Sequence, residues 1–132
     1  MCADWAFEDD DSDNFALPGG QTVYVPAGGS AVLGRDDDPT SNGGVTVDYA
    51  FASGMQLANG ADELALLHGT AIIDHIAWDD GASWPDPTGA SISLSPSATN
   101  ATDNDDGANW CSASSPYGDG DKGTPGDPND GC

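Results

Sequence analysis

Apolar residues occur along this chain in short runs, which polar, glycine-rich and proline-rich stretches separate. Hydrophobic character alternates over residues 5–7, 15–17 and 92–94. Alternation with a period of two places every second side chain on one face of an extended strand. Further strand candidates are residues 22–25, 31–33, 45–47 and 49–51. The pattern therefore predicts a series of short β-strands separated by turns.

The clearest signal for a larger unit is a β-hairpin in the middle of the chain. Residues 63–67 and 71–78 have the character of strands and flank the tight turn at residues 68–70. In the second arm, the even-numbered residues 72–78 share one face, and the odd-numbered residues 73–77 share the other. This hairpin is expected to be the longest strand pair of the fold.

Composition disfavours helices and favours turns. Glycine and proline together supply 27 of the 132 residues, and both oppose the interior of a helix. Residues 58–67 have an ambiguous period, but Gly60 and Gly69 confine this run to the length of a strand. Short strands at regular spacing between Gly, Pro and Asp turns are typical of an all-β sandwich or barrel.

The length of 132 residues predicts one domain over residues 1–132. Its apolar share of 37% is low, so we expect a compact core built from short runs such as residues 22–25 and 72–73. Residues 95–132 are rich in Ser, Asp, Gly and Pro. We expect Trp110 and Tyr117 to pack this loop-like part onto the rest of the domain.

The charge balance narrows the classes of partner. The sequence has 23 acidic residues, 21 of them Asp, against only Arg35 and Lys122, which gives a formal net charge of −21. Such a surface repels nucleic acid and anionic lipid, which both need basic side chains to neutralise phosphate. No run reaches the roughly 18 apolar residues that would cross a membrane. The acid is interpreted either as a solubilising surface or as a source of ligands for divalent cations.

Two acidic runs are candidates for calcium, which prefers several closely spaced oxygen ligands. One run offers alternate carboxylates at Asp9, Asp11 and Asp13, and the other offers Asp103 and Asp105. Neither run fits the twelve-residue loop of an EF-hand. The alternative interpretation is that both runs are solvated turns.

Three cysteines point to one disulfide and one remaining thiol. Cys2, Cys111 and Cys132 lack the close pairing of a zinc site. An acidic chain poor in lysine is interpreted as exported, and disulfides persist in oxidising compartments. We expect a bond between Cys2 and Cys111 that ties the first strand to the last, with Cys111–Cys132 as the alternative. We also expect the chain to follow an export signal or to be a piece of a longer protein, because no basic, apolar leader opens it.

Catalytic residues are not apparent. Neither His68 nor His75 accompanies a nucleophile motif, and both are expected at the surface or half-buried. The pair Asp79-Asp80 beside Trp84 resembles a carboxylate pair near a sugar-binding ring, but a polar loop explains it equally well. Trp84 becomes the leading contact for carbohydrate or protein if it is exposed; otherwise it is a lid over the core. We predict that the chain is not an enzyme.

Several segments resemble the lamin-tail domain. They are residues 15–18, 25–29, 32–35, 55–67, 68–74, 89–92, 109–111 and 123–129, of which the closing Gly-Thr-Pro-Gly at 123–126 is the most specific. The resemblance covers roughly residues 5–129. It implies an immunoglobulin-like β-sandwich that serves as a module of exported or cell-surface proteins.

The chain departs from this family in two places. The two strands with which the family opens are absent before Trp5, and Ser93 stands where the family often has a basic residue. The missing strands would leave sheet edges unpaired, so we expect self-association through those edges or a lowered stability.

The sequence favours a non-catalytic structural or interaction module, secreted or at the cell surface, acting in adhesion, scaffolding or the positioning of a neighbouring domain. Its partner is expected to be a protein or a carbohydrate. The alternative is a calcium-stabilised accessory module of a secreted hydrolase that binds carbohydrate or protein.

Overall fold

The computed structural model describes residues 4–10, 13–19 and 23–132, and these residues are almost entirely strands and loops. The described strands are β1 (Trp5–Glu8), β2 (Asn14–Ala16), β3 (Leu33–Gly34), β4 (Tyr49–Ala50), β5 (Ala61–His68), β6 (Ala71–Asp79), β7 (Ile92–Leu94), β8 (Trp110–Ser112), β9 (Pro116–Tyr117) and β10 (Asp121–Lys122). Two 3₁₀ turns, η1 (Asp103–Asp105) and η2 (Gly107–Asn109), are the only helical elements of the described residues. The all-β prediction is therefore confirmed.

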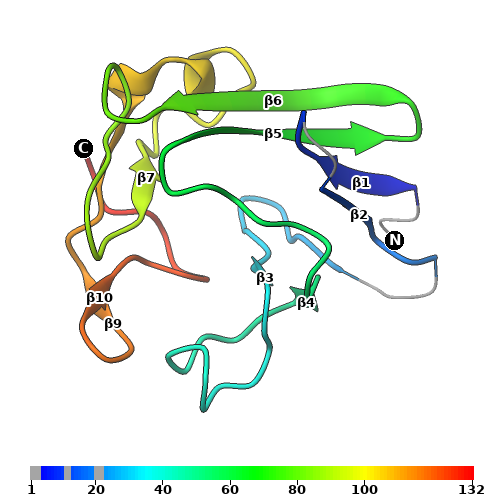
Figure 1. The fold of residues 1–132 in the computed structure, drawn as a ribbon, viewed down its shortest axis with the longest axis horizontal. Coiled ribbons are helices and arrows are strands. Elements are labelled where there is room, and N and C mark those ends of the chain that lie inside the picture. Colours follow the sequence, from blue (N-terminus) through cyan, green and yellow to red (C-terminus); the bar gives the residue numbers. More distant parts are fainter. Residues whose placement is uncertain (1–3, 11–12, 20–22) are drawn as a thin grey trace.

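The largest element is an antiparallel sheet with the strand order β2-β1-β5-β6. Its centre is the predicted hairpin: β5 and β6 run side by side along the molecule and are joined by a tight turn (Figure 1). Gly69 in this turn has a φ of 62°, a left-handed conformation that glycine adopts without steric cost. The hairpin thus forms where the sequence places a strand pair around a permissive turn.

The predicted alternation holds over most of β6 and breaks at one place. Asp74, Ile76 and Trp78 are partly buried, and the residues between them are exposed. Leu66 pairs with Asp74 whereas Leu67 pairs with Ile72, so the register shifts by one residue. Such a bulge interrupts the two-residue period. The expectation that residues 72–73 belong to the core is wrong: Ile72 is 66% and Ile73 is 46% exposed.

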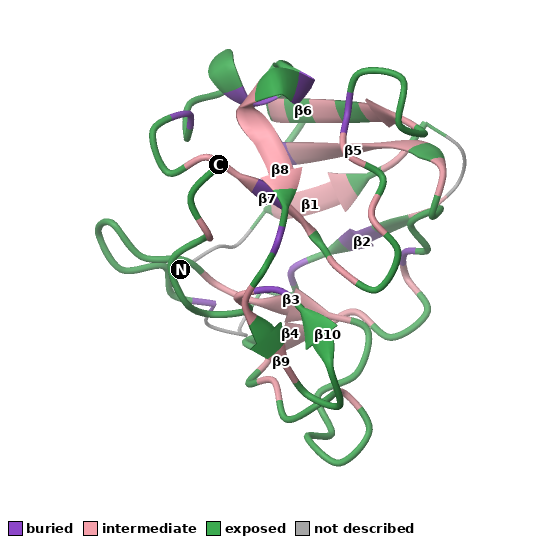
Figure 2. Cartoon of the chain, turned by 90° about the vertical axis from the view of Figure 1, so that its left-hand side faces the viewer, coloured by how far each residue is buried: buried purple, intermediate pink, exposed green. Residues whose placement is uncertain are grey.

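The remaining strands form three separate pairs: β3 with β4, β7 with β8, and β9 with β10. The first pair is parallel and the other two are antiparallel. In Figure 2 the β7–β8 pair lies above the β9–β10 and β3–β4 pairs, and a parallel bridge between Ala90 and Lys122 joins the approach to β7 to β10. Strands predicted at residues 5–7, 15–17, 49–51 and 92–94 correspond to β1, β2, β4 and β7.

Two strand predictions are wrong. Residues 45–47 form a loop that follows a turn, where the Asn42 side chain hydrogen-bonds both the amide and the carbonyl of Val45. Residues 23–25 are not in a strand either, and residue 22 lies outside the described part of the chain. Val23 is buried, but Tyr24 is 71% exposed. A short apolar run therefore contributes a single side chain to the core here.

The core is small and centres on one aromatic ring. Phe15, Leu17, Val23 and Met55 form its buried cluster. The ring of Phe15 lies 5.0 Å from that of Phe7 and 4.9 Å from that of Phe51, between ring centroids. No side chain among the described residues is less than 2% exposed. No core side chain of the described residues is therefore fully enclosed, and an open cleft adjoins the core.

Candidate functional site

An apolar cleft of about 430 Å³ opens between the four-stranded sheet and the segments that face it. The sheet contributes Phe7, Phe15 and Leu64, one from each of three strands. The segment that leads into β5 adds Met55 and Leu57. Leu57 is 48% exposed, so an apolar side chain stands at the mouth of the cleft.

The opposite wall of the cleft has two parts. Residues 30–33, at the start of β3, form one part, and residues 124–127 together with Asn129 form the other. The second part belongs to the C-terminal tail, which returns from β10 across the molecule (Figure 1). Binding in the cleft therefore depends on how firmly this tail is held.

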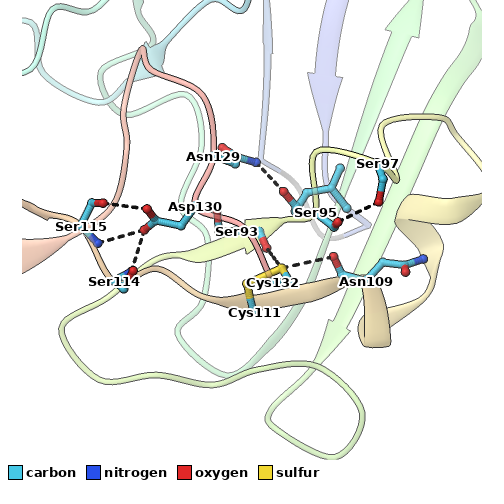
Figure 3. Close-up of a disulfide and its surroundings, with 11 residues drawn as sticks. Ser93, Ser95, Ser97, Asn109, Cys111, Ser114, Ser115, Asn129, Asp130 and Cys132 are labelled. Carbon is cyan, nitrogen blue, oxygen red and sulfur yellow. Dashed lines mark hydrogen bonds between the residues drawn. A yellow bond between two sulfur atoms is a disulfide. The ribbon is translucent and has the colours of Figure 1, made fainter.

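A disulfide holds the tail at its end. Cys111 in β8 is bonded to Cys132, and their Cα atoms are 5.5 Å apart. The Cys132 sulfur also lies 3.5 Å from the carbonyl oxygen of Ser93 in the neighbouring strand (Figure 3). The expected Cys2–Cys111 bond is therefore wrong, and the alternative is correct. Cys2 itself lies outside the described residues.

The physical reason for this pairing is the strand arrangement. Cys111 lies opposite Ser93 in the β7–β8 pair, whereas β1 belongs to the large sheet beside β5. The tail runs back along β7, where the Asn129 side chain donates a hydrogen bond of 2.9 Å to the Leu94 carbonyl. This contact brings Cys132 to Cys111.

Asp130 is a third anchor of the tail. Its carboxylate accepts hydrogen bonds from the Ser114 amide at 2.7 Å, the Ser115 amide at 2.9 Å and the Ser115 hydroxyl at 2.7 Å (Figure 3). The Ser115 hydroxyl contributes most, and the two amides add to it, so the pKa of Asp130 falls to about 2. Hydrogen bonds to the charged form favour that form.

Asp130→Asn is expected to destabilise the protein at neutral pH. The carboxyl pKa is lower in the folded chain than its ordinary value of 3.8, so the stabilisation is present above the ordinary pKa and is lost as pH falls through about 2. The Tm difference between the variant and the wild type should therefore shrink as pH falls from about 4 to about 2. Thermal unfolding across this range measures it. Asp119→Asn, at an exposed acid of the nearby turn, should show no such pH dependence.

Two carboxylates lie beside the cleft, next to the segment that carries Leu57. The Asp13 carboxylate accepts a hydrogen bond of 2.9 Å from the Gln56 amide, between the cleft residues Met55 and Leu57. The Asp62 carboxylate accepts one from the Ala58 amide, which follows Leu57. We call Asp13 and Asp62 the acidic rim; neither lines the cleft itself, and both are partly buried.

The candidate calcium ligands are not gathered into one site by the described residues. Asp9 and Asp13 close the β1–β2 turn, because the Asp9 carboxylate accepts the Asp13 amide at 3.1 Å, and Asp11 lies outside the described residues. Asp103 and Asp105 are exposed in η1. Within the described ranges, no group of three or more His, Cys, Asp or Glu side chains could hold a metal ion.

Trp84 is a packing residue and not a surface contact. It is only 7% exposed, and its ring lies 5.1 Å from that of Trp110. The Asp79 carboxylate holds its loop by accepting the amides of Ser83 at 2.9 Å and Trp84 at 3.0 Å. These two bonds, Ser83 first, lower the pKa of Asp79. Trp84 would be a binding residue only if it were exposed, and it is buried. Asp79 stabilises the loop that carries Trp84.

The histidines lie where the sequence predicted, at the surface. His68 is exposed at the end of β5, with its ring 5.0 Å from that of Trp5. His75 is exposed on β6. On that strand, Asp74 points to the other face and accepts a 2.7 Å hydrogen bond from the Asn104 side-chain amide. This bond joins η1 to the sheet, and the Trp110 indole donates a 2.8 Å hydrogen bond to the Asn104 carbonyl, which braces the segment between η1 and β8.

The sequence does not predict the cleft. The pattern of its apolar residues is typical of a core, and the composition of its tail wall is typical of a polar loop. The half-exposed Leu57, in a segment rich in small and polar residues, is the one sequence signal that could have drawn attention to it. An open position was not deducible without the long-range contacts described above.

The described residues thus form a mostly β structure with an apolar cleft, a disulfide-anchored tail and many acidic side chains. Comparison with protein-family models, with curated proteins and with solved structures gives no match to this chain. Among the described residues, no helix has the length and apolar character needed to cross a membrane.

Proposed function

We propose that this chain is a non-catalytic interaction module of an exported or surface-displayed protein, and that the apolar cleft is its binding surface. The observation that carries this proposal is the open cleft itself, lined by Phe7, Phe15, Leu57 and Leu64. Ligand sites are commonly apolar concavities of roughly 300–1,000 Å³. A module of this kind serves adhesion, scaffolding or the positioning of a neighbouring domain.

The residue chemistry supports binding over catalysis. The carboxylates of Asp13 and Asp62 beside the cleft accept backbone amides of the segment that carries Leu57, and no nucleophile motif accompanies them. The disulfide supports a place outside the cytoplasm, because such bonds persist in oxidising compartments. The finer fold that we propose is the immunoglobulin-like sandwich of lamin-tail type, in which the strand pairs opposite the large sheet act as the second layer.

The cleft is expected to bind a neutral apolar dye, and Leu57→Gln should weaken this binding about fivefold because it removes part of the apolar mouth. Nile red fluorescence, titrated against the oxidised protein, measures the dissociation constant. Ile72→Gln is the matched control, since Ile72 is apolar and exposed but lies on β6 outside the cleft. Equal effects of the two variants, or an absence of saturable binding, would contradict the proposed function.

A further inference from the structure

We propose that the partner of the cleft is a protein segment in which apolar side chains are flanked by lysine or arginine. The inference rests on the proposed function, because it assigns a class of partner to the same cleft. Two features of the structure carry it: the apolar lining, and the carboxylates that lie beside Leu57 and in the tail wall.

The apolar part of the partner follows from what the cleft leaves uncovered. Leu57 is 48% exposed, and Phe7 and Leu64 are only partly buried although both pack against the core cluster. Covering such side chains with apolar groups of a partner is favourable, since it removes their surface from water. The other walls of the cleft, residues 30–33 and 124–127, add the apolar side chains of Val32, Leu33 and Pro125 to this surface.

The basic part follows from the position of the carboxylates. The acidic rim adjoins Leu57 through the backbone: Asp13 accepts the amide of Gln56, which precedes Leu57, and Asp62 accepts the amide of Ala58, which follows it. On the tail side, Asp127 lines the cleft itself. Each rim carboxylate accepts a backbone amide, which fixes its place, and a carboxylate retains further acceptor capacity for lysine or arginine.

The charge of the chain argues against a second copy as the occupant. Two copies would each bring a formal net charge of −21, and like charges oppose close association. The chain has only two basic residues, Arg35 and Lys122, and neither lines the cleft. A complementary partner must therefore supply the positive charge from another protein.

Isothermal titration calorimetry with four short synthetic peptides tests the proposal on the oxidised chain. One peptide has a leucine–phenylalanine centre flanked by lysines. The second replaces the lysines by glutamine, the third replaces them by glutamate, and the fourth keeps the lysines but has a serine–glycine centre. At low ionic strength the first peptide should bind about tenfold more tightly than the second. The third and fourth should bind more weakly still.

Matched variants locate the binding. Leu57→Gln should weaken the first peptide about fivefold, whereas Ile72→Gln should leave it unchanged. Asp127→Asn should reduce the advantage of the first peptide over the second, whereas Asp119→Asn, remote from the lining, should not. At about 1 M salt the Debye length falls to ~3 Å, so the advantage of the lysines should largely disappear.

Every other result overturns the proposal in a recognisable way. Equal binding of the first and fourth peptides would mean attraction to the acidic surface alone. Equal binding of the first and second would leave the cleft as the site but remove the basic requirement. Nile red binding without peptide binding would leave the proposed function standing with a small molecule as the ligand. Dimers in sedimentation that Leu57→Gln dissociates would identify a second copy as the occupant.

Discussion

Replacing Phe15 with alanine is expected to lower the free energy of unfolding by about 3 kcal/mol, at the low end of values for buried phenylalanine. Phe15 lies 9% exposed at the centre of the buried cluster. Its ring stacks on Phe7, on Phe51 and, at 5.8 Å between centroids, on Tyr49. It also lines the cleft, so water can enter the space that the ring leaves. This access keeps the cost below that of a sealed cavity.

Urea unfolding of the oxidised protein measures this loss as a lower midpoint with an unchanged slope. The control is Ile72→Ala, which removes an apolar side chain that is 66% exposed and should change the stability by no more than about 0.5 kcal/mol. Domains of this size are stable by roughly 5–15 kcal/mol, so the Phe15 variant should remain folded at room temperature. Similar losses in both variants would mean that the core does not centre on Phe15.

The strands that the sequence predicts correctly are those whose pattern lies within a short run of consecutive residues. The β5–β6 hairpin follows from two alternating runs around a turn that contains Gly69, and all of this information lies within about twenty consecutive residues. The same is true of β1 and β7. Alternation fails where a neighbouring strand changes the register, as at the bulge that exposes Ile72 and Ile73. A bulge depends on the partner strand, so one strand's own pattern does not reveal it.

The candidate site depends on contacts between distant parts of the chain. Gln56 binds Asp13 across 43 residues, and Asn129 binds Leu94 across 35. No local pattern encodes such pairs. Trp84 illustrates the same limit, because its loop sequence, with Ser and Pro beside it, is typical of an exposed turn. The ring is nevertheless buried against Trp110, which belongs to β8.

The sequence predicts the wrong disulfide for a related reason. The spacing of three cysteines does not select a pair, and a bond between Cys2 and Cys111 would require the first and last strands to be neighbours. The β7–β8 pair and the Asn129 contact instead bring the tail to Cys111. The bond therefore closes a loop of the C-terminal part, with a sequence separation of 21 residues.

Removing this bond is expected to lower the free energy of unfolding by about 3 kcal/mol, as the chain-entropy relation gives for a loop of this length. The variant is Cys111→Ser with Cys132→Ser, and it should be compared with its parent under oxidising conditions by urea unfolding. Residues 124–127 lie inside the closed loop and form one wall of the cleft. The same variant should therefore bind Nile red more weakly, because the wall loses its covalent anchor and then depends on hydrogen bonds such as those of Gly123, Asn129 and Asp130.

Cys2→Ser is the matched control, and it separates the two possible pairings. If Cys111 is bonded to Cys132, the Cys2 variant keeps the stability of its parent and loses stability when a reductant is added. A loss of about 4.7 kcal/mol from Cys2→Ser alone, as the same relation gives for a loop of roughly 100 residues, would place the bond at Cys2 instead. An effect on stability without an effect on dye binding would show that the tail keeps its position through Asn129 and Asp130. In that case the disulfide would stabilise the fold chiefly by restricting the unfolded chain, and the geometry of the cleft would be set by hydrogen bonds.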